Sequence, residues 1–214
     1  MKKILVAAVM LLCGLNAFAQ LNVGGGYLFE FAPMRSDGHK TGEYEMHGVY
    51  AGASYNIEIA GSGFGIAPGA YFTWAGGTQH YADGTKAIER LPGSVLRYGS
   101  RRMALTIPVY ATYAFEVGPG SLFAYAGPSF QCGLSFKTYT KGKEDNIKVS
   151  HVSENLYGRD YDLRMLDLKL GVGFGYRWKF LQVNLGCDFG LIDADPDFEA
   201  LHFHTIHLGA AYVF

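Results

Sequence analysis

The stretch LTIPVYATYAFEVGPGSLFAYAGPSFQCGLSF, residues 105–136, decides the fold, because its two halves alternate in opposite phase around one turn. Apolar side chains occupy every second position, which is the periodicity of a β-strand with one apolar face. Pairing Gly118 with Ser121 across the turn would make the two apolar faces coincide. The stretch therefore predicts a long β-hairpin. Its apolar face is expected to contain Leu105, Ile107, Val109, Ala111, Tyr113, Phe115, Leu122, Ala124, Ala126, Pro128, Phe130, Cys132, Leu134 and Phe136.

The length and the second face of this hairpin indicate where it lies. Its arms are longer than the five or six residues typical of strands in a soluble sandwich. The second face mixes small and polar residues, such as Thr106, Ser129 and Gln131. Strands of about ten residues that are apolar outside and small or polar inside are typical of a transmembrane β-barrel. The hairpin therefore predicts an all-β membrane protein.

The same alternation recurs along the chain and predicts eight strands. They are expected at about residues 21–33, 44–59, 64–74, 105–117, 122–136, 165–178, 181–191 and 204–214. The expected long loops are residues 35–43, 75–100, 138–163 and 193–199, and short turns separate the other strands. In outer-membrane barrels the periplasmic turns are short and the extracellular loops long. The prediction is an eight-stranded antiparallel up-and-down transmembrane β-barrel with short periplasmic turns and long extracellular loops.

The N-terminal segment has the order of a secretory signal peptide. Lys2 and Lys3 precede an apolar run at residues 4–15, and small residues flank an expected cleavage site after Ala19. Leu12, directly before Cys13, is too large for a lipoprotein signal, so no lipid anchor is predicted. The predicted organisation is a signal peptide at residues 1–19 and a barrel domain at residues 20–214.

Charge and cysteine usage limit the partners and the crosslinks. Without Lys2 and Lys3, 16 of the 18 basic residues remain against 19 acidic ones, a net charge of 16 − 19 = −3. This balance gives no reason to expect a nucleic acid partner. Cys132 and Cys187 lie on the apolar faces of strands that another strand separates. A disulfide between them is therefore not predicted.

A soluble sandwich or lipocalin-like barrel would show the same alternation, with its apolar side chains inside. The polar face favours the transmembrane barrel hypothesis, because its charged residues are interleaved with glycines and suit a narrow lumen. A two-residue turn at Lys179-Phe180 would place Asp188 opposite Gly171 and diagonal to Lys169. We expect one hydrogen-bonded network that blocks permeation, because an unpaired buried ion costs several kcal/mol. The predicted lumen network is Glu30, Glu58, Glu116, Asp167, Lys169, Arg177 and Asp188.

Five segments carry a family resemblance. They are IPVYATYAF, FAYAGPSF, LKLGVGFGYRW, LQVNLGCDFGL and the closing HLGAAYVF. In these segments the sequence resembles the Bacteroidota outer-membrane β-barrel family that includes PorT-like proteins. The resemblance spans nearly all of the chain after the signal segment, and it implies a membrane barrel; some family members contribute to secretion of surface proteins. The terminal Phe214 resembles the assembly signal that the barrel-insertion machinery recognises.

Two motifs are candidate ligand-binding sites. Gly171-x-Gly173-x-Gly175 lies inside a predicted strand, so it lacks the strand-to-helix context of a nucleotide-binding loop. The acidic loop and its neighbours could supply ligands for Ca²⁺ or a transition metal, although a solvated acidic loop is the favoured interpretation. The candidate metal ligands are Asp193, Asp195, Asp197, Glu199, His202 and His204. No cofactor is predicted.

Two further groups of residues are candidates for acting on lipid or binding it. His151-x-Ser153 is similar to the His-x-Ser arrangement of outer-membrane lipid A deacylases, but a loop serine without a third orienting group does not favour an enzyme. Positive residues in and after the second long loop are placed to meet lipopolysaccharide phosphates. They are Lys86, Arg90, Arg97, Arg101 and Arg102.

The leading hypothesis is a non-enzymatic outer-membrane barrel whose lumen is filled by its own side chains. An eight-stranded barrel has just enough interior for packed side chains, so a general porin is disfavoured. It would act through its extracellular loops as a structural, adhesive or secretion-accessory component. Its expected partners are outer-membrane lipid, lipopolysaccharide and a protein bound through the loops. The alternatives are a lipid A-modifying enzyme that uses His151 and Ser153, and a small-ligand carrier or channel.

Overall fold

The structure is a computed structural model that describes residues 19–36, 38–59, 62–81, 83, 85–86, 88–91, 94–144, 147–152, 155–157, 163–195 and 200–214. The strands are β1 (Ala19–Ser36), β2 (His39–Glu58), β3 (Phe64–Tyr81), β4 (Ile88–Leu91), β5 (Ser94–Val117), β6 (Gly120–Glu144), β7 (Ile147–Val152), β8 (Leu166–Trp178), β9 (Leu181–Gly190), β10 (Ala200–Leu201) and β11 (His204–Val213). Most of the predicted signal peptide lies outside the described residues, so its cleavage stays a prediction. No helix in the described part of the chain is long and apolar enough to cross a membrane.

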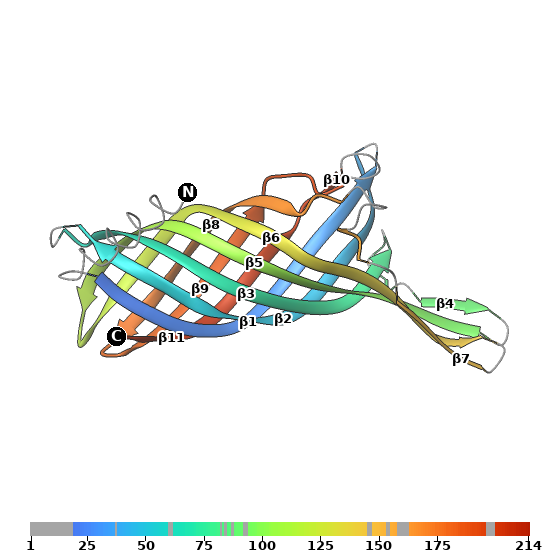
Figure 1. Ribbon diagram of the computed structural model, residues 1–214, viewed down its shortest axis with the longest axis horizontal. Coiled ribbons are helices and arrows are strands. Elements are labelled where there is room, and N and C mark those ends of the chain that lie inside the picture. Colours follow the sequence, from blue (N-terminus) through green and yellow to red (C-terminus); the bar gives the residue numbers. More distant parts are fainter. Residues whose placement is uncertain are drawn as a thin grey trace, which may run out of the picture.

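Eight of these strands close into an antiparallel barrel (Figure 1). Around the ring the order is β1, β2, β3, β5, β6, β8, β9 and β11. The first and last strands meet along a ladder from Asn22↔Val213 to Phe31↔His204, which leaves the ring without an edge. The short strands β4, β7 and β10 lie in the connections outside this ring. The predicted eight-stranded up-and-down barrel is therefore confirmed.

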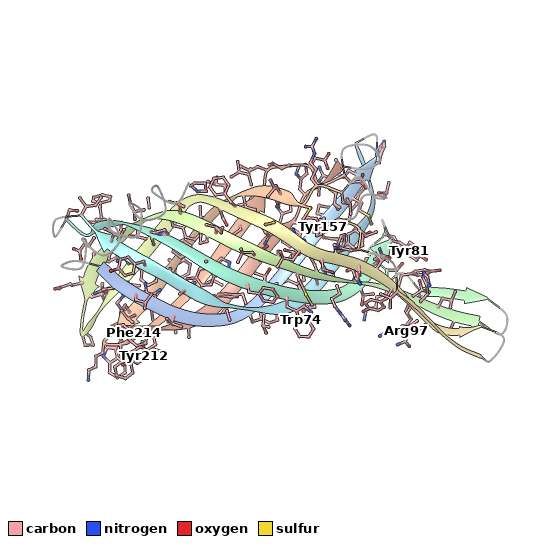
Figure 2. The ribbon with its side chains drawn as sticks, in the orientation of Figure 1. Trp74, Tyr81, Arg97, Tyr157, Tyr212 and Phe214 are labelled. Carbon is pink, nitrogen blue, oxygen red and sulfur yellow. The ribbon has the colours of Figure 1, made fainter. Side chains whose placement is uncertain are left out.

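Large apolar side chains point away from the lumen, as in a barrel that faces lipid. Exposed positions recur on every strand of the ring, and Trp74 on β3, at 47% exposure, is typical of them. Figure 2 shows Tyr212 and Phe214 at the end with the short turns, and Trp74 nearer the other end. From Phe64 to Trp74 the strand rises about 25 Å along the barrel axis, at about 3.4 Å per residue and about 40° of tilt. That height matches the apolar band of an outer-membrane barrel, so the soluble alternative is wrong.

Several predicted loops are instead continuations of strands. β5 has 24 residues and β6 has 25, far more than the ten or so needed to span a membrane. Beyond the barrel they carry β4 and β7 on their outer edges, and this four-stranded ribbon projects from the end opposite the C-terminus (Figure 1). We call it the arm: β4, residues 94–101 of β5, residues 137–144 of β6, and β7.

The expected loops at residues 35–43, 75–100 and 138–163 are accordingly wrong in much of their length. β1 and β2 continue to a hairpin end at Ser36↔His39, and β3 continues to Tyr81. Beyond the lipid both faces of a strand meet water, so the apolar alternation ends while the backbone ladder continues. The alternation therefore marked the membrane-spanning part of each strand and not its full length.

The two predicted hairpin turns differ in outcome. At the first, Val117 pairs with Gly120 instead of Gly118 with Ser121, because Gly118 adopts φ 62° and permits a two-residue turn. This shift of two residues leaves each side chain on its expected face. At the second, Trp178 pairs with Leu181 and Gly171 with Asp188, as predicted.

A bulge changes one face of the opening hairpin. The register shifts between Met103 and Ala104, so that Leu134 has no partner of its own on β5. An extra residue reverses the faces that follow it. Leu134 is exposed, whereas Phe136, which was expected outside with it, points inward and is fully buried. Cys132 on the same strand is a free thiol, as predicted, and so is Cys187.

Candidate functional site

A buried ion cluster lies in the extracellular half of the lumen, with Glu30 of β1 at its centre. The Glu30 carboxylate accepts a hydrogen bond from Arg102 Nη1 at 2.7 Å, and Lys169 Nζ lies 3.6 Å from the same oxygen. Lys169 also donates to Thr205 Oγ1 at 3.0 Å. The three charged side chains are at most 5% exposed. Strands β1, β5, β8 and β11 are thus tied together across the lumen.

An apolar plug lies against this cluster at the extracellular mouth. Arg102 Nε donates to the Tyr157 hydroxyl at 2.8 Å, and its guanidinium lies 4.0 Å from the centre of the Phe203 ring. Phe203 meets Phe136 edge to face at 5.7 Å. Burial raises the pKa of the Tyr157 phenol, so this group stays neutral beside Arg102. The plug comprises Leu28, Ala32, Met46, Ala75, Phe136, Tyr157, Ala194, Leu201 and Phe203.

The plug depends on two connections that fold back into the barrel. Tyr157 comes from the connection between β7 and β8, and Figure 2 places it in the half of the barrel from which the arm departs. Phe203 lies two residues after the end of β10, which pairs with β1 through Met34↔Leu201 and so holds the connection at the barrel rim. These segments fill the mouth with side chains of the chain itself.

A second polar cluster lies deeper in the lumen around Asp188 of β9. Tyr110 donates a hydrogen bond to Asp188 Oδ1 at 2.7 Å, and His207 Nδ1 lies 3.4 Å from the other carboxylate oxygen. The Tyr125 hydroxyl lies 3.0 Å from His207 Nε2, and its ring stacks on Tyr110 at 5.0 Å. The imidazole is therefore held between a carboxylate and a phenol.

The glycines of β8 form the floor beneath this aromatic layer. A Cβ added at Gly171 would lie less than 3.0 Å from Tyr110, and one at Gly173 would lie equally close to Tyr125. At Gly175 the group in the way is the ring of Phe123. The Gly-x-Gly-x-Gly run thus makes room for three aromatic rings in a narrow lumen. This role agrees with its exclusion as a nucleotide-binding loop.

The structure divides the predicted lumen network. It brings Glu30 and Lys169 together, and it places Asp167, which is buried opposite Gln131, on the same face of β8. Asp188 belongs to the second cluster, since the closest acceptors of Lys169 are Glu30 and Thr205 and not the predicted diagonal carboxylate.

The remaining predicted members lie at the periplasmic end. Arg177 bonds Gln20 and, at 3.1 Å, Gln182. Glu58 and Glu116 are exposed and bond to neither buried cluster. Glu58 is the last residue of β2 and Glu116 is next to the last of β5, where water reaches the carboxylates. The expectation of one continuous network is therefore not met.

Sequence reasoning missed Arg102, Tyr110, Tyr125 and His207. Arg102 was expected to meet lipopolysaccharide, but it is 3% exposed and bonds Glu30 inside the barrel. Its phase could have shown this, because it shares the inward face of β5 with Ala104 and Thr106. Tyr110 lies on that same face of β5 and Tyr125 on the inward face of β6, so the alternation also marked both tyrosines as lumen residues.

A cavity of about 130 Å³ lies in the lumen below the Glu30 cluster, and we call it the polar cavity because most of the residues around it carry a polar group. Its walls include Asn22, Tyr71, Asn184 and Asp188, and it reaches Arg177 toward the periplasmic end. That volume holds on the order of ten water molecules. The lumen is therefore packed at the extracellular mouth and polar beneath it.

The candidate metal ligands of the acidic loop lie in different surroundings. Asp193 Oδ1 accepts from the backbone N–H groups of Asp195 and Leu201, at 3.1 and 2.8 Å, so it braces its own loop. Among the residues that the structure describes, no group of three or more acidic, His or Cys side chains could hold a metal ion; Asp197 and Glu199 lie outside them. His202 is half-buried near the plug.

The His204 ring is tilted against Phe31 at 5.2 Å and meets Phe189 edge to face at 6.1 Å. His151 is exposed on β7 in the arm, and its suggested partner Ser153 lies outside the described residues. The metal and deacylase hypotheses therefore gain no assembled site.

A closed eight-stranded ring with an apolar exterior, a plugged mouth and a polar lumen defines a small outer-membrane β-barrel protein. Residues 5–214 match the family of the outer membrane protein beta-barrel domain, and the chain belongs to this family. A comparison with curated proteins gives no match.

Among solved structures, the chain is similar to Ail, the attachment invasion locus protein of Yersinia pestis. The identity is 14%, the coverage is 92% of this chain and 99% of that one, and the TM-score is 0.45. It is also similar to Neisserial surface protein A, with 12% identity, 91% and 97% coverage and a TM-score of 0.41. These likenesses concern the fold alone.

Proposed function

We propose that this protein is a non-enzymatic, non-conducting scaffold of the outer membrane that acts at the cell surface through its arm. The observation that carries the proposal is the length of β5 and β6, which continue beyond the barrel and gain β4 and β7 as partners. Strands that only anchored a protein would end near the lipid boundary. The projecting ribbon offers a folded contact surface on a rigid base.

The arm supports an adhesive role above a purely structural or a secretion-accessory one. A pre-ordered ribbon loses little conformational entropy on binding, which favours direct contact with a partner. The resemblance to PorT-like proteins supports the secretion-accessory alternative, and the polar cavity supports a small-ligand carrier. Phe214, exposed at the periplasmic end, fits a role in recognition by the barrel-insertion machinery.

Replacing the arm tests the proposal. A Gly-Ser linker would replace residues 83–98 and a second one residues 140–152, and both variant and wild type would be expressed in cells that lack the gene. We expect the variant to form a heat-modifiable barrel, because the β3–β5 and β6–β8 ladders and the β5–β6 ladder from Gly99↔Tyr139 to Val117↔Gly120 remain intact, yet to restore no adherence. Export of surface proteins, measured in the same cells, separates the adhesive role from the secretion-accessory one.

Full adherence with the arm-replaced barrel would contradict the proposal. A matched variant with a linker only at residues 60–61, in a periplasmic connection, controls for the effect of the linker itself and should adhere like wild type.

A further inference from the structure

Four positive side chains gather on the outer face of the arm. We call them the cationic patch: Arg97, Arg101, Lys137 and Lys141, all exposed. Arg101 is paired across the strands with Lys137, and Arg97 with Lys141. Like charges directly opposite each other destabilise an antiparallel pair. Two such pairs on one face need anions to offset their repulsion.

No described acidic side chain forms an ion pair with the cationic patch. The nearby Glu45 of β2 instead faces His80 at 3.5 Å. The patch therefore presents its positive charge outward.

Tyr139 gives the patch a fixed centre. It pairs with Gly99 between the two charged pairs, and a Cβ at Gly99 would collide with its ring. The Tyr139 hydroxyl donates to the Gly77 carbonyl oxygen at 3.2 Å, so the ring lies across β5 onto β3. Lys141 Nζ lies over this ring at 4.9 Å. The ammonium and guanidinium groups thus flank a held aromatic surface.

The register places the patch just beyond the membrane boundary, with the Arg101 and Lys137 pair nearest to it. Arg101 pairs with Gly76, two residues beyond the exposed Trp74, which pairs with Met103. Tryptophan marks the headgroup level of a membrane. At about 3.4 Å per residue, Arg101 lies about 7 Å along the strand beyond Trp74 and Arg97 about 14 Å further. Figure 2 shows Arg97 on the arm beyond Trp74.

We propose that the cationic patch binds the phosphate groups of lipid A in the outer leaflet. Guanidinium groups bind phosphate through two parallel hydrogen bonds, and ammonium groups add point charges. The membrane's own lipid is the source, because the patch continues the same strand face that exposes Leu105 to the acyl chains. Lipid bound there offsets the repulsion within both like-charge pairs and fixes the base of the arm. The assignment goes beyond the proposed function and does not depend on which partner the arm contacts.

Titration of the full-length protein in micelles with bisphosphorylated lipid A tests this assignment. We expect the double variant Arg101→Gln/Lys137→Gln to bind at least tenfold more weakly than wild type, and Arg97→Gln/Lys141→Gln to behave alike. Binding by wild type should also weaken as NaCl rises, because salt screens exposed charges. The control Lys179→Gln removes an exposed positive charge at a periplasmic turn and should leave the affinity unchanged.

Two comparison ligands identify what is bound. Dephosphorylated lipid A should bind at least tenfold more weakly than the bisphosphorylated form, and dextran sulfate, a soluble polyanion, should not compete at equal charge concentration. Wild-type affinity in both double variants, or equal binding of dephosphorylated lipid A, would overturn the proposal. Preferential binding of dextran sulfate would overturn the membrane source. Heat-modifiable migration of each variant shows that its barrel is folded, and unchanged adherence would separate this result from the proposed function.

Discussion

Arg102→Ala is expected to lower the free energy of unfolding by about 3 to 5 kcal/mol, because it leaves a buried carboxylate without its main partner. Arg102 bonds Glu30 at 2.7 Å and Tyr157 at 2.8 Å, and it covers the Phe203 ring. Lys169 remains 3.6 Å from Glu30, but its ammonium cannot replace the bond to Tyr157. The change therefore loosens both the ion cluster and the plug. Urea unfolding in micelles, followed by the fluorescence of Trp74 and Trp178, measures the loss.

The neighbouring arginine provides a matched control. Arg101→Ala removes the same side chain one residue away, on the exposed face of the same strand. Surface substitutions of this kind change stability by about 0.5 kcal/mol or less. An Arg102→Ala protein as stable as Arg101→Ala would show that the Glu30 cluster contributes little to folding.

Gly173→Val is expected to destabilise the barrel by about 1 to 3 kcal/mol through overpacking. The added Cβ would enter the space of the Tyr125 ring and approach the Leu185 backbone carbonyl, each within 3.0 Å. Tyr125 must then leave its position over β8, which breaks its 3.0 Å contact with His207 and its stacking on Tyr110. The same unfolding assay reports the change in midpoint.

Val172→Leu is the control for this substitution. Val172 lies next to Gly173 on β8 but is exposed on the outer face. Its enlargement meets lipid or detergent and should leave the midpoint unchanged. Equal midpoints for Gly173→Val and Val172→Leu would mean that the aromatic layer rearranges without loss of stability.

The membrane-spanning fold could be predicted because lipid imposes a regular pattern. In β8, Leu168, Leu170 and Val172 alternate with Lys169, Gly171 and Gly173, so the two faces are distinct in the sequence. The arm could not be predicted in the same way, since residues 94–101 and 137–144 meet water and carry no apolar period. Phe136 was assigned to the wrong face because a bulge leaves no mark in hydrophobicity.

The contacts inside the lumen could be predicted only in part. Charged residues in the inward phase, such as Glu30 and Lys169, could be chosen from the pattern, but their partners come from strands far apart in sequence. The alternation also shows only whether a residue points into the lumen and not how far along the barrel axis it lies. Glu58 and Glu116 near the strand ends therefore looked equivalent to Glu30. The plug residues Tyr157 and Phe203 lie in connections, where no strand period assigns a direction.

Single-channel recording of the purified wild-type protein in planar bilayers tests the central claim, a barrel closed by its own side chains, most directly. The Glu30 cluster and the plug around Phe136 and Phe203 lie on the extracellular side of the polar cavity, so we expect insertion with no steady conductance steps. Reproducible steps of uniform size from the folded, heat-modifiable protein would contradict this account and identify the lumen as a channel.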